Sequence, residues 1–135
     1  MDKKERVRKY GEVFTPQWMV DRMCDELPDN AFEPARTFLE PACGEGVFVL
    51  EILRRKFKRC KSRKDYSTAI ASVYAMEIQP QNVEETIRAV TELCKKYFDL
   101  TKADIETINN HVILCDSLKV MRMMSDSQLW KSGEE

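Results

Sequence analysis

Three acidic residues, Glu40, Glu77 and Asp116, follow apolar segments of strand length in this chain. Two glycines, Gly44 and Gly46, lie just beyond the first of them, in the sequence LEPACGEGVFVLEIL. A glycine turn between a strand and a helix lets backbone N–H groups approach a nucleotide-like ligand closely. Carboxylates beside such a turn favour a ligand that presents hydrogen-bond donors or positive charge, and they disfavour phosphate.

S-adenosylmethionine fits this combination better than a dinucleotide or a nucleoside triphosphate. The dinucleotide motif G-x-G-x-x-G lacks its third glycine here, and the G-K-[ST] of a phosphate-binding loop does not occur. We expect Glu77 to accept hydrogen bonds from the ribose hydroxyls, Glu40 to face the ammonium group and Asp116 to accept from the adenine amine. A nicotinamide-dependent oxidoreductase is an alternative, which tight NADH binding would support.

Four short segments resemble, in the same order, the cofactor-binding motifs of the N6-adenine DNA methyltransferases of restriction–modification systems. They are YGEVFTP at 10–16, LEPACGEGVF at 39–48, AMEI at 75–78 and LCDS at 114–117. The resemblance implies S-adenosylmethionine as cofactor, DNA as substrate and methyl transfer to adenine as reaction. It also implies cofactor contacts from twelve residues, which are Phe14, Thr15, Pro16, Glu40, Ala42, Cys43, Gly44, Gly46, Glu77, Ile78, Asp116 and Ser117.

The family also carries an Asn/Asp-Pro-Pro-aromatic tetrapeptide that holds the target adenine after it is flipped from the duplex. No such tetrapeptide occurs in the 135 residues. We therefore expect the N-terminal, cofactor-binding portion of an adenine methyltransferase, inactive by itself and without a catalytic residue. The alternative is a non-catalytic module, either a remnant or one half of a split enzyme. Its first strand would form an exposed sheet edge, open to self-association or to a complementing C-terminal chain.

Alternating apolar segments predict the elements that position these residues. The alternation favours a parallel sheet with right-handed crossovers, a Rossmann-like α/β methyltransferase fold truncated to about three strands with flanking helices. Thr15 is expected to cap the first helix, and the second strand is expected to be buried on both faces. The expected strands are 37–39, 69–76 and 111–115, with helices at 16–27, 45–59 and 80–98, a helical turn at 105–109 and a solvated turn at 58–65.

Composition restricts the remaining classes of function. The formal net charge is −1, and no apolar run is long enough to span a bilayer. The chain has a single histidine, and its five cysteines show no C-x-x-C spacing, so we expect no metal site, no disulfides and a cytoplasmic location.

The basic run at 54–64 is interpreted as a solvated helix end rather than a DNA-binding surface, and the methionines at 121, 123 and 124 as packing residues. We divide the chain into a charged, mobile segment at 1–9, a cofactor domain at 10–124 and a polar tail at 125–135.

Overall fold

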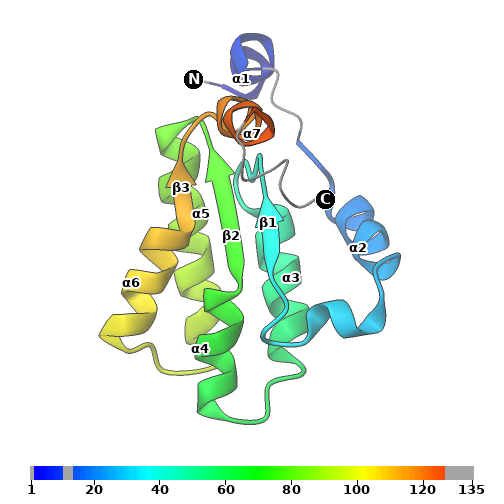
Figure 1. Ribbon diagram of the computed structural model, residues 1–135, viewed down its shortest axis with the longest axis vertical. Helices are drawn as coiled ribbons and strands as arrows, with labels where there is room; N and C mark the ends of the chain where they lie inside the picture. Colours follow the sequence, from blue (N-terminus) through cyan, green and yellow to red (C-terminus); the bar gives the residue numbers. More distant parts are fainter. Residues whose placement is uncertain (1, 11–13, 127–135) are drawn as a thin grey trace.

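Three short parallel strands form the sheet of this protein, which a computed structural model describes at residues 2–10 and 14–126 (Figure 1). The strands β1 (Phe38–Glu40), β2 (Val73–Glu77) and β3 (Val112–Leu114) lie in the order β1-β2-β3. The α/β class and the three-stranded parallel sheet with flanking helices are therefore confirmed. In the described part of the chain, β2 is the central strand and β1 lies at an edge, as predicted.

Helices precede, connect and follow the strands, and several of them begin at recognisable signals. Ser62 accepts a hydrogen bond from the backbone N–H of Asp65, which caps a helix, and Thr101 forms a reciprocal capping box with Asp104. The described helices are α1 (Lys3–Tyr10), α2 (Gln17–Asp25), the 3₁₀ turn η1 (Asp29–Phe32), α3 (Val47–Phe57), α4 (Arg63–Ala71), α5 (Pro80–Lys95), α6 (Lys102–His111) and α7 (Ser117–Ser125).

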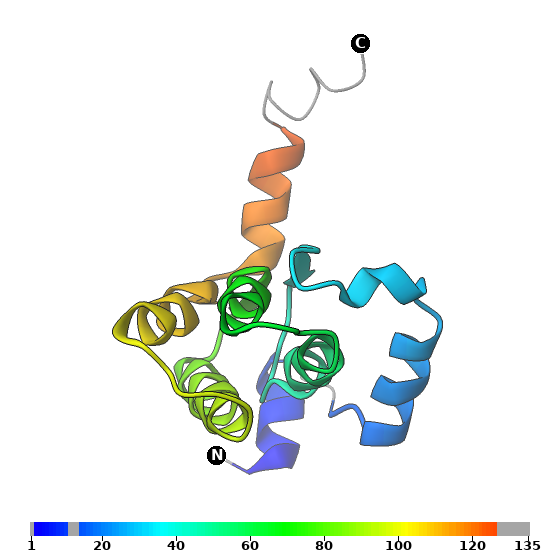
Figure 2. The ribbon, with the colours of Figure 1, turned by 90° about the horizontal axis from the view of Figure 1, so that it is seen from below.

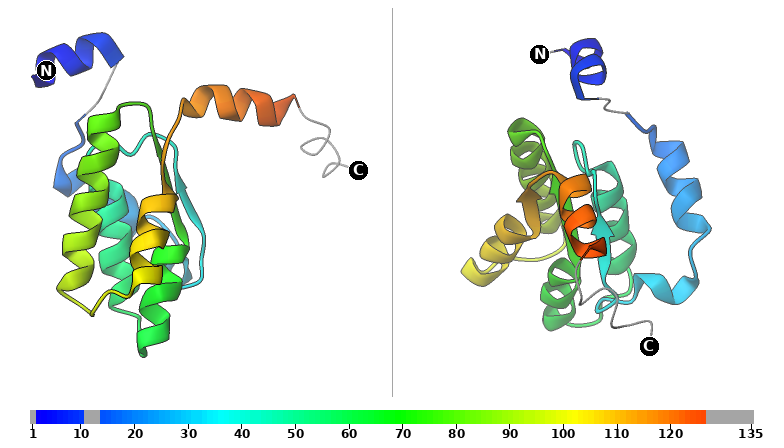
Figure 3. Two further views of the ribbon diagram at one scale, coloured as in Figure 1. Left: turned by 90° about the vertical axis from the view of Figure 1, so that its left-hand side faces the viewer. Right: turned by 45° about the horizontal axis from the view of Figure 1, so that its top comes forward.

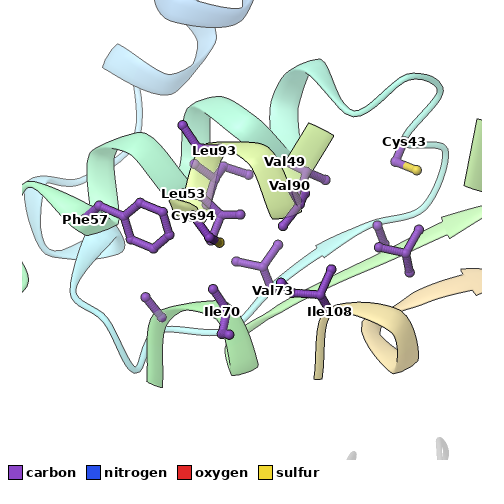
Figure 4. Close-up of a cluster of buried hydrophobic side chains, with 14 of the residues drawn as sticks. Cys43, Val49, Leu53, Phe57, Ile70, Val73, Val90, Leu93, Cys94 and Ile108 are labelled. Atoms are coloured by element: carbon purple, nitrogen blue, oxygen red, sulfur yellow. The ribbon is translucent and has the colours of Figure 1, made fainter. Parts of the chain in front are cut away.

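The hydrophobic core lies between one face of the sheet and helices α3 and α5 (Figures 1 and 2). Figure 4 shows Leu53 and Val90 from these two helices above Val73 of β2, with Cys43 at the end of the cluster nearest the loop that follows β1. These four side chains are at most 7% exposed. Because Cys43 belongs to the core, packing of α3 and α5 also fixes the start of the loop that was predicted to hold the cofactor.

The opposite face of the sheet is not covered by the described residues, which corrects the expectation of a strand buried on both faces. Along β2 the buried Val73, Ala75 and Glu77 alternate with half-buried residues. On the open face, Leu39 pairs in register with Tyr74, and the Leu39 side chain is 50% exposed. Helix α7 projects away from this side instead of lying on it (Figures 2 and 3). The open face of the sheet is therefore partly exposed to solvent, most of all at Leu39.

Several element boundaries differ from the sequence prediction. The apolar residues Ala69–Ala71 end α4 rather than begin a strand. The reason is that Ser62, which lies in the segment expected to be a turn, caps a helix that runs to Ala71. Pro16, not Thr15, is the N-cap of α2, and it forms no side-chain capping bond. The helical turn expected at 105–109 is the longer helix α6, and α7 was not predicted at all.

The N-terminal segment, which was expected to be charged and mobile, contains a helix among its described residues. Residues 3–10 form α1, and the side chain of Arg6 is buried, with the residue only 7% exposed. The physical reason is long-range pairing: the guanidinium group contacts Glu45 and Asn82, which are distant in sequence. The Gly11–Val13 part of the first predicted motif and the tail at 127–135 lie outside the described residues.

The basic run is not simply a solvated helix end. Lys56 is fully buried, and its ammonium group donates to the backbone oxygens of Glu33, Pro34 and Arg36 at 2.9, 3.2 and 2.6 Å. Arg59 pairs with Asp29 at 2.8 Å. These contacts fasten the segment before β1 to α3.

The three methionines of α7 do not pack as predicted. Met121, Met123 and Met124 are 40%, 72% and 49% exposed, and α7 contains no buried residue. The reason is that α7 projects from the domain, so no described element packs over it (Figure 3).

No helix among the described residues is both long and apolar enough to cross a membrane. The same residues contain no group of three or more His, Cys, Asp or Glu side chains that could hold a metal ion.

Candidate cofactor-binding site

The carboxyl ends of the three strands meet at one edge of the sheet, the upper edge in Figure 1. Glu40 ends β1, Glu77 ends β2, and Asp116 follows β3 after one intervening residue. Backbone pairing continues past the strands, since Cys43 N–H donates to Met76 and Cys115 N–H donates to Glu77, both at 3.0 Å. The parallel topology therefore places the three predicted carboxylates on a common rim.

The loop after β1 has the conformation that its two glycines allow. Gly44 has φ +55° and Gly46 has φ +93°, in the left-handed region that other residues disfavour. Gly46 is the N-cap of α3, and a Cβ atom there would lie only 3.0 Å from the Thr86 side chain. The hydroxyl of Thr86 donates to the carbonyl oxygen of Gly44 at 3.0 Å. Close packing against α5 thus requires glycine at position 46.

Glu77 is buried and already accepts three hydrogen bonds. Its carboxylate receives the backbone N–H groups of Gly44 at 3.2 Å and Gln79 at 2.8 Å, and the side-chain amide of Asn82 at 3.4 Å. Glu77 therefore couples β2, the glycine loop and the start of α5. A ligand hydroxyl at this carboxylate would join or replace one of these donors.

A buried arginine extends this network to α1. Arg6 donates to the carboxylate of Glu45 at 3.0 Å and to the side-chain oxygen of Asn82 at 2.5 Å, and Asn82 in turn donates to Glu77. Arg6 also lies over the ring of Phe14, 5.0 Å from its centroid. These contacts join α1 to the segment before α2, to the glycine loop, to α5 and, through Asn82, to the end of β2.

A cavity of about 220 Å³ opens between α1, the segment before α2 and the glycine loop. Half of the twelve predicted residues line it, namely Phe14, Thr15, Glu40, Ala42, Cys43 and Gly44, together with Lys3, Glu45, Val47 and Phe48. The structure therefore brings the segment at 14–15 against the loop at 40–44, although α2 and η1 lie between them in the sequence.

Burial controls the protonation of two groups in this cavity. Burial raises the pKa of Glu40, and a hydrogen bond from the Ala42 backbone N–H at 3.1 Å opposes that rise. Burial raises the pKa of the Cys43 thiol to about 11, although a hydrogen bond with Thr86 lowers the pKa in part. Cys43 is consequently a neutral thiol near pH 7, whereas a cationic ligand group beside Glu40 would favour the ionised form of that carboxylate.

The other six predicted residues do not line the cavity. Pro16 is exposed at the start of α2, and Gly46 is buried beneath the loop. Ile78 is 50% exposed beyond the end of β2. Asp116 caps α7 by accepting the Lys119 backbone N–H at 3.2 Å, and Ser117 begins that helix. Glu77, Ile78, Asp116 and Ser117 therefore lie along the open rim beyond β2 and β3 rather than in the cavity.

Four residues at the site lie outside the sequence motifs and were not predicted: Lys3, Arg6, Asn82 and Thr86. Asn82 and Thr86 could have been predicted from the sequence. They lie one helical turn apart at the start of a helix that follows the strand ending in Glu77, so their side chains face the same end of the sheet. The two basic residues could not, since nothing in a charged N-terminal segment indicates which cations become buried.

The fold and the acidic rim define a parallel α/β domain with a cavity at the carboxyl ends of its strands. The chain is 30% identical over 86 residues to the Type II methyltransferase M.VspI of Vibrio sp. (strain 343), a match that covers 64% of this chain. The matched segment spans only 18% of that curated relative. The similarity supports a methyltransferase-related origin for the chain. No family model and no solved structure matches it.

Proposed function

We propose that this chain is the S-adenosylmethionine-binding part of a DNA adenine-N6 methyltransferase of a restriction–modification system. One observation carries the proposal: Phe14 and Thr15 share a cavity with Glu40 and the glycine loop. The family resemblance implies this arrangement around the methionine end of the cofactor. The name of the Vibrio relative, a Type II methyltransferase, supports the same reaction class.

In this proposal the chain binds and orients the cofactor, and the cofactor supplies the methyl group as a sulfonium. Glu40 faces the ammonium group, where burial of both charges strengthens their attraction. Glu77 accepts from the ribose hydroxyls, and Ile78 packs against the adenine. Asp116 accepts from the adenine amine beside Ser117, and Gly44 and Gly46 allow the loop to approach the ligand closely.

Calorimetric titration with S-adenosylhomocysteine tests cofactor binding. We expect the wild-type chain to bind it, Glu77→Ala to weaken binding at least tenfold through loss of charge-assisted hydrogen bonds, and Glu84→Ala to bind as wild type. Glu84 is an exposed residue of α5, which makes it a matched control for loss of a carboxylate. Circular dichroism of Glu77→Gln, which keeps the side-chain shape, separates a binding defect from unfolding. Tight NADH binding without S-adenosylhomocysteine binding would favour an oxidoreductase instead.

The chain by itself transfers no methyl group to DNA in this proposal, because the sequence lacks the Asn/Asp-Pro-Pro-aromatic tetrapeptide. A filter assay with duplex DNA and labelled cofactor should therefore show only background incorporation. Methylation of DNA by the purified 135-residue chain would contradict this point.

We propose that a further polypeptide segment carries this tetrapeptide and completes the enzyme. Its place is beside β1 and over the open face of the sheet, where Leu39 and Ile113 are 50% and 37% exposed. Parallel sheets are normally covered on both faces, and an unpaired edge strand accepts another strand. The open face therefore favours a half-enzyme that needs a complement, rather than a binding module that is sufficient by itself.

A further inference from the structure

The cavity contains charges of both signs, and the proposed function does not yet assign a role to the positive charge. Glu40 lines it from β1, and Lys3 lines it from α1. Glu45, the second carboxylate in the cavity wall, is already paired with Arg6 at 3.0 Å. Within the described residues, Lys3 forms no ion pair with a carboxylate, and its ammonium group lies 4.8 Å from the centroid of the Phe14 ring.

The cavity matches one end of a ligand rather than a whole one. Its volume is about 220 Å³. Sites that enclose a drug-sized molecule usually measure about 300–1,000 Å³. An amino-acid group fits such a space, whereas a nucleoside extends along the open rim toward Glu77 and Asp116. Apart from Glu45, which is paired with Arg6, the charged groups of the cavity wall are Glu40 and Lys3, and a zwitterion requires one charge of each sign.

Contacts of α1 explain why Lys3 is held at this position. Lys3 and Arg6 lie one helical turn apart, so they share a face of α1. Arg6 is buried and bonds to Glu45 and Asn82, which fastens that face to the glycine loop and to α5. The Phe14 ring contacts both cations and forms part of the cavity wall. Arg6 and Phe14 are therefore positioning residues, and Lys3 is the cation that faces the space.

We propose that Lys3 of α1 binds the carboxylate of the ligand's α-amino acid group in this cavity, beside the ammonium group already assigned to Glu40. The inference rests on the proposed function, because it concerns the methionine end of the same cofactor. It adds Lys3, a residue of α1 that lies outside the four sequence motifs, to the binding site. It also predicts which chemical group of the ligand decides affinity.

Calorimetry of the full 135-residue chain with three ligands tests the inference. S-adenosylmethionine carries both charges of the amino acid group, decarboxylated S-adenosylmethionine lacks only the carboxylate, and 5′-methylthioadenosine lacks the whole group. We expect the wild-type chain to bind S-adenosylmethionine about tenfold or more tightly than its decarboxylated form, the scale of a charge-assisted hydrogen bond. Lys3→Gln should lose most of that difference and should leave affinity for the decarboxylated ligand unchanged.

Lys4→Gln is the matched control, because it makes the same change of charge at the next, exposed residue of α1. It should keep the wild-type preference for the carboxylate. Equal effects of Lys3→Gln and Lys4→Gln would overturn the inference, because the preference would then reflect overall charge. Equal affinity of the wild-type chain for all three ligands would also overturn it and leave the proposed function standing. Failure of all three ligands to bind would overturn both.

Discussion

Gly46 shows how one residue can link backbone conformation to the site. Its φ is +93°, and a Cβ atom at this position would lie 3.0 Å from the Thr86 side chain, so there is no room for a larger residue. The same threonine donates to the carbonyl of Gly44. A side chain at position 46 would therefore move the loop away from α5 and disturb the hydrogen bond that shapes its first glycine.

Gly46→Ala is expected to destabilise the protein by roughly 1–3 kcal/mol, the cost of a strained left-handed residue with a steric contact. Urea unfolding followed by circular dichroism measures this loss. The double variant Gly46→Ala/Thr86→Ser is the control, because it removes the methyl group that the new Cβ would approach and keeps the hydroxyl donor. Recovery of part of the stability in the double variant identifies steric contact as the cause, and no recovery would contradict it.

At the scale of elements, the helices at the amino ends of the strands are held by buried polar contacts. Asp104 is 3% exposed and accepts hydrogen bonds from the Thr101 backbone N–H, Arg63 and the Ser67 hydroxyl. These contacts join α4 to α6. Since α4 leads into β2 and α6 leads into β3, Asp104 helps to fix the two strands whose far ends carry Glu77 and Asp116.

Asp104 also makes stability depend on pH in the acid range. Burial alone would raise its pKa, but the hydrogen bonds from Thr101, Arg63 and Ser67 outweigh burial and lower the pKa from 3.8 to about 2. Because the pKa is lower in the folded state, this contribution is fully present above pH 4 and is lost as the pH falls to 2. A difference of this size corresponds to about 2 kcal/mol.

The free energy of unfolding in urea, measured from pH 2 to 6, tests this dependence. The wild type should be more stable than Asp104→Asn above pH 4, and the difference should shrink by about 2 kcal/mol toward pH 2. Glu106→Gln, which removes an exposed carboxyl group from the same helix, should follow the wild-type profile. A constant difference between wild type and Asp104→Asn at all pH values would contradict the assignment.

At the scale of the whole molecule, the sheet has one covered and one open face. Helices α3 and α5 cover the first, and α7 projects from the side of the second, with Leu118 71% exposed (Figure 3). Apolar area of this kind is usually found at an interface. The open face is thus a candidate interface with another polypeptide.

Purified chain is expected to self-associate reversibly at high concentration through this open face when no complement is present. Leu39→Lys places a charge on the face and should weaken association at least tenfold in sedimentation equilibrium. Ile105→Lys, a similar change at an exposed residue of α6, should associate as wild type. A wild-type chain that stays a monodisperse monomer at high concentration would contradict the expectation.

The sequence by itself determined the local features of this protein. Apolar segments ending in Glu40, Glu77 and Asp116 predicted a parallel sheet with an acidic rim, and the fold agrees, because parallel strands bring their carboxyl ends to one edge. The glycines of the loop could be predicted as well, since their conformational freedom is a property of the residue itself. The helix at 63–71 was missed despite the Ser62 cap, because the apolar run at 69–76 reads equally well as strand.

Only the tertiary structure decided how the site is closed and which face stays open. Arg6 meets Asn82 across 76 positions of sequence, and no local pattern predicts such a pair. The same holds for Lys3, which enters the cavity wall only because Arg6 anchors α1. The exposure of Leu39 likewise depends on where α7 runs. Local residue chemistry fixed the elements and the rim, whereas contacts between distant segments fixed the cavity and the uncovered sheet.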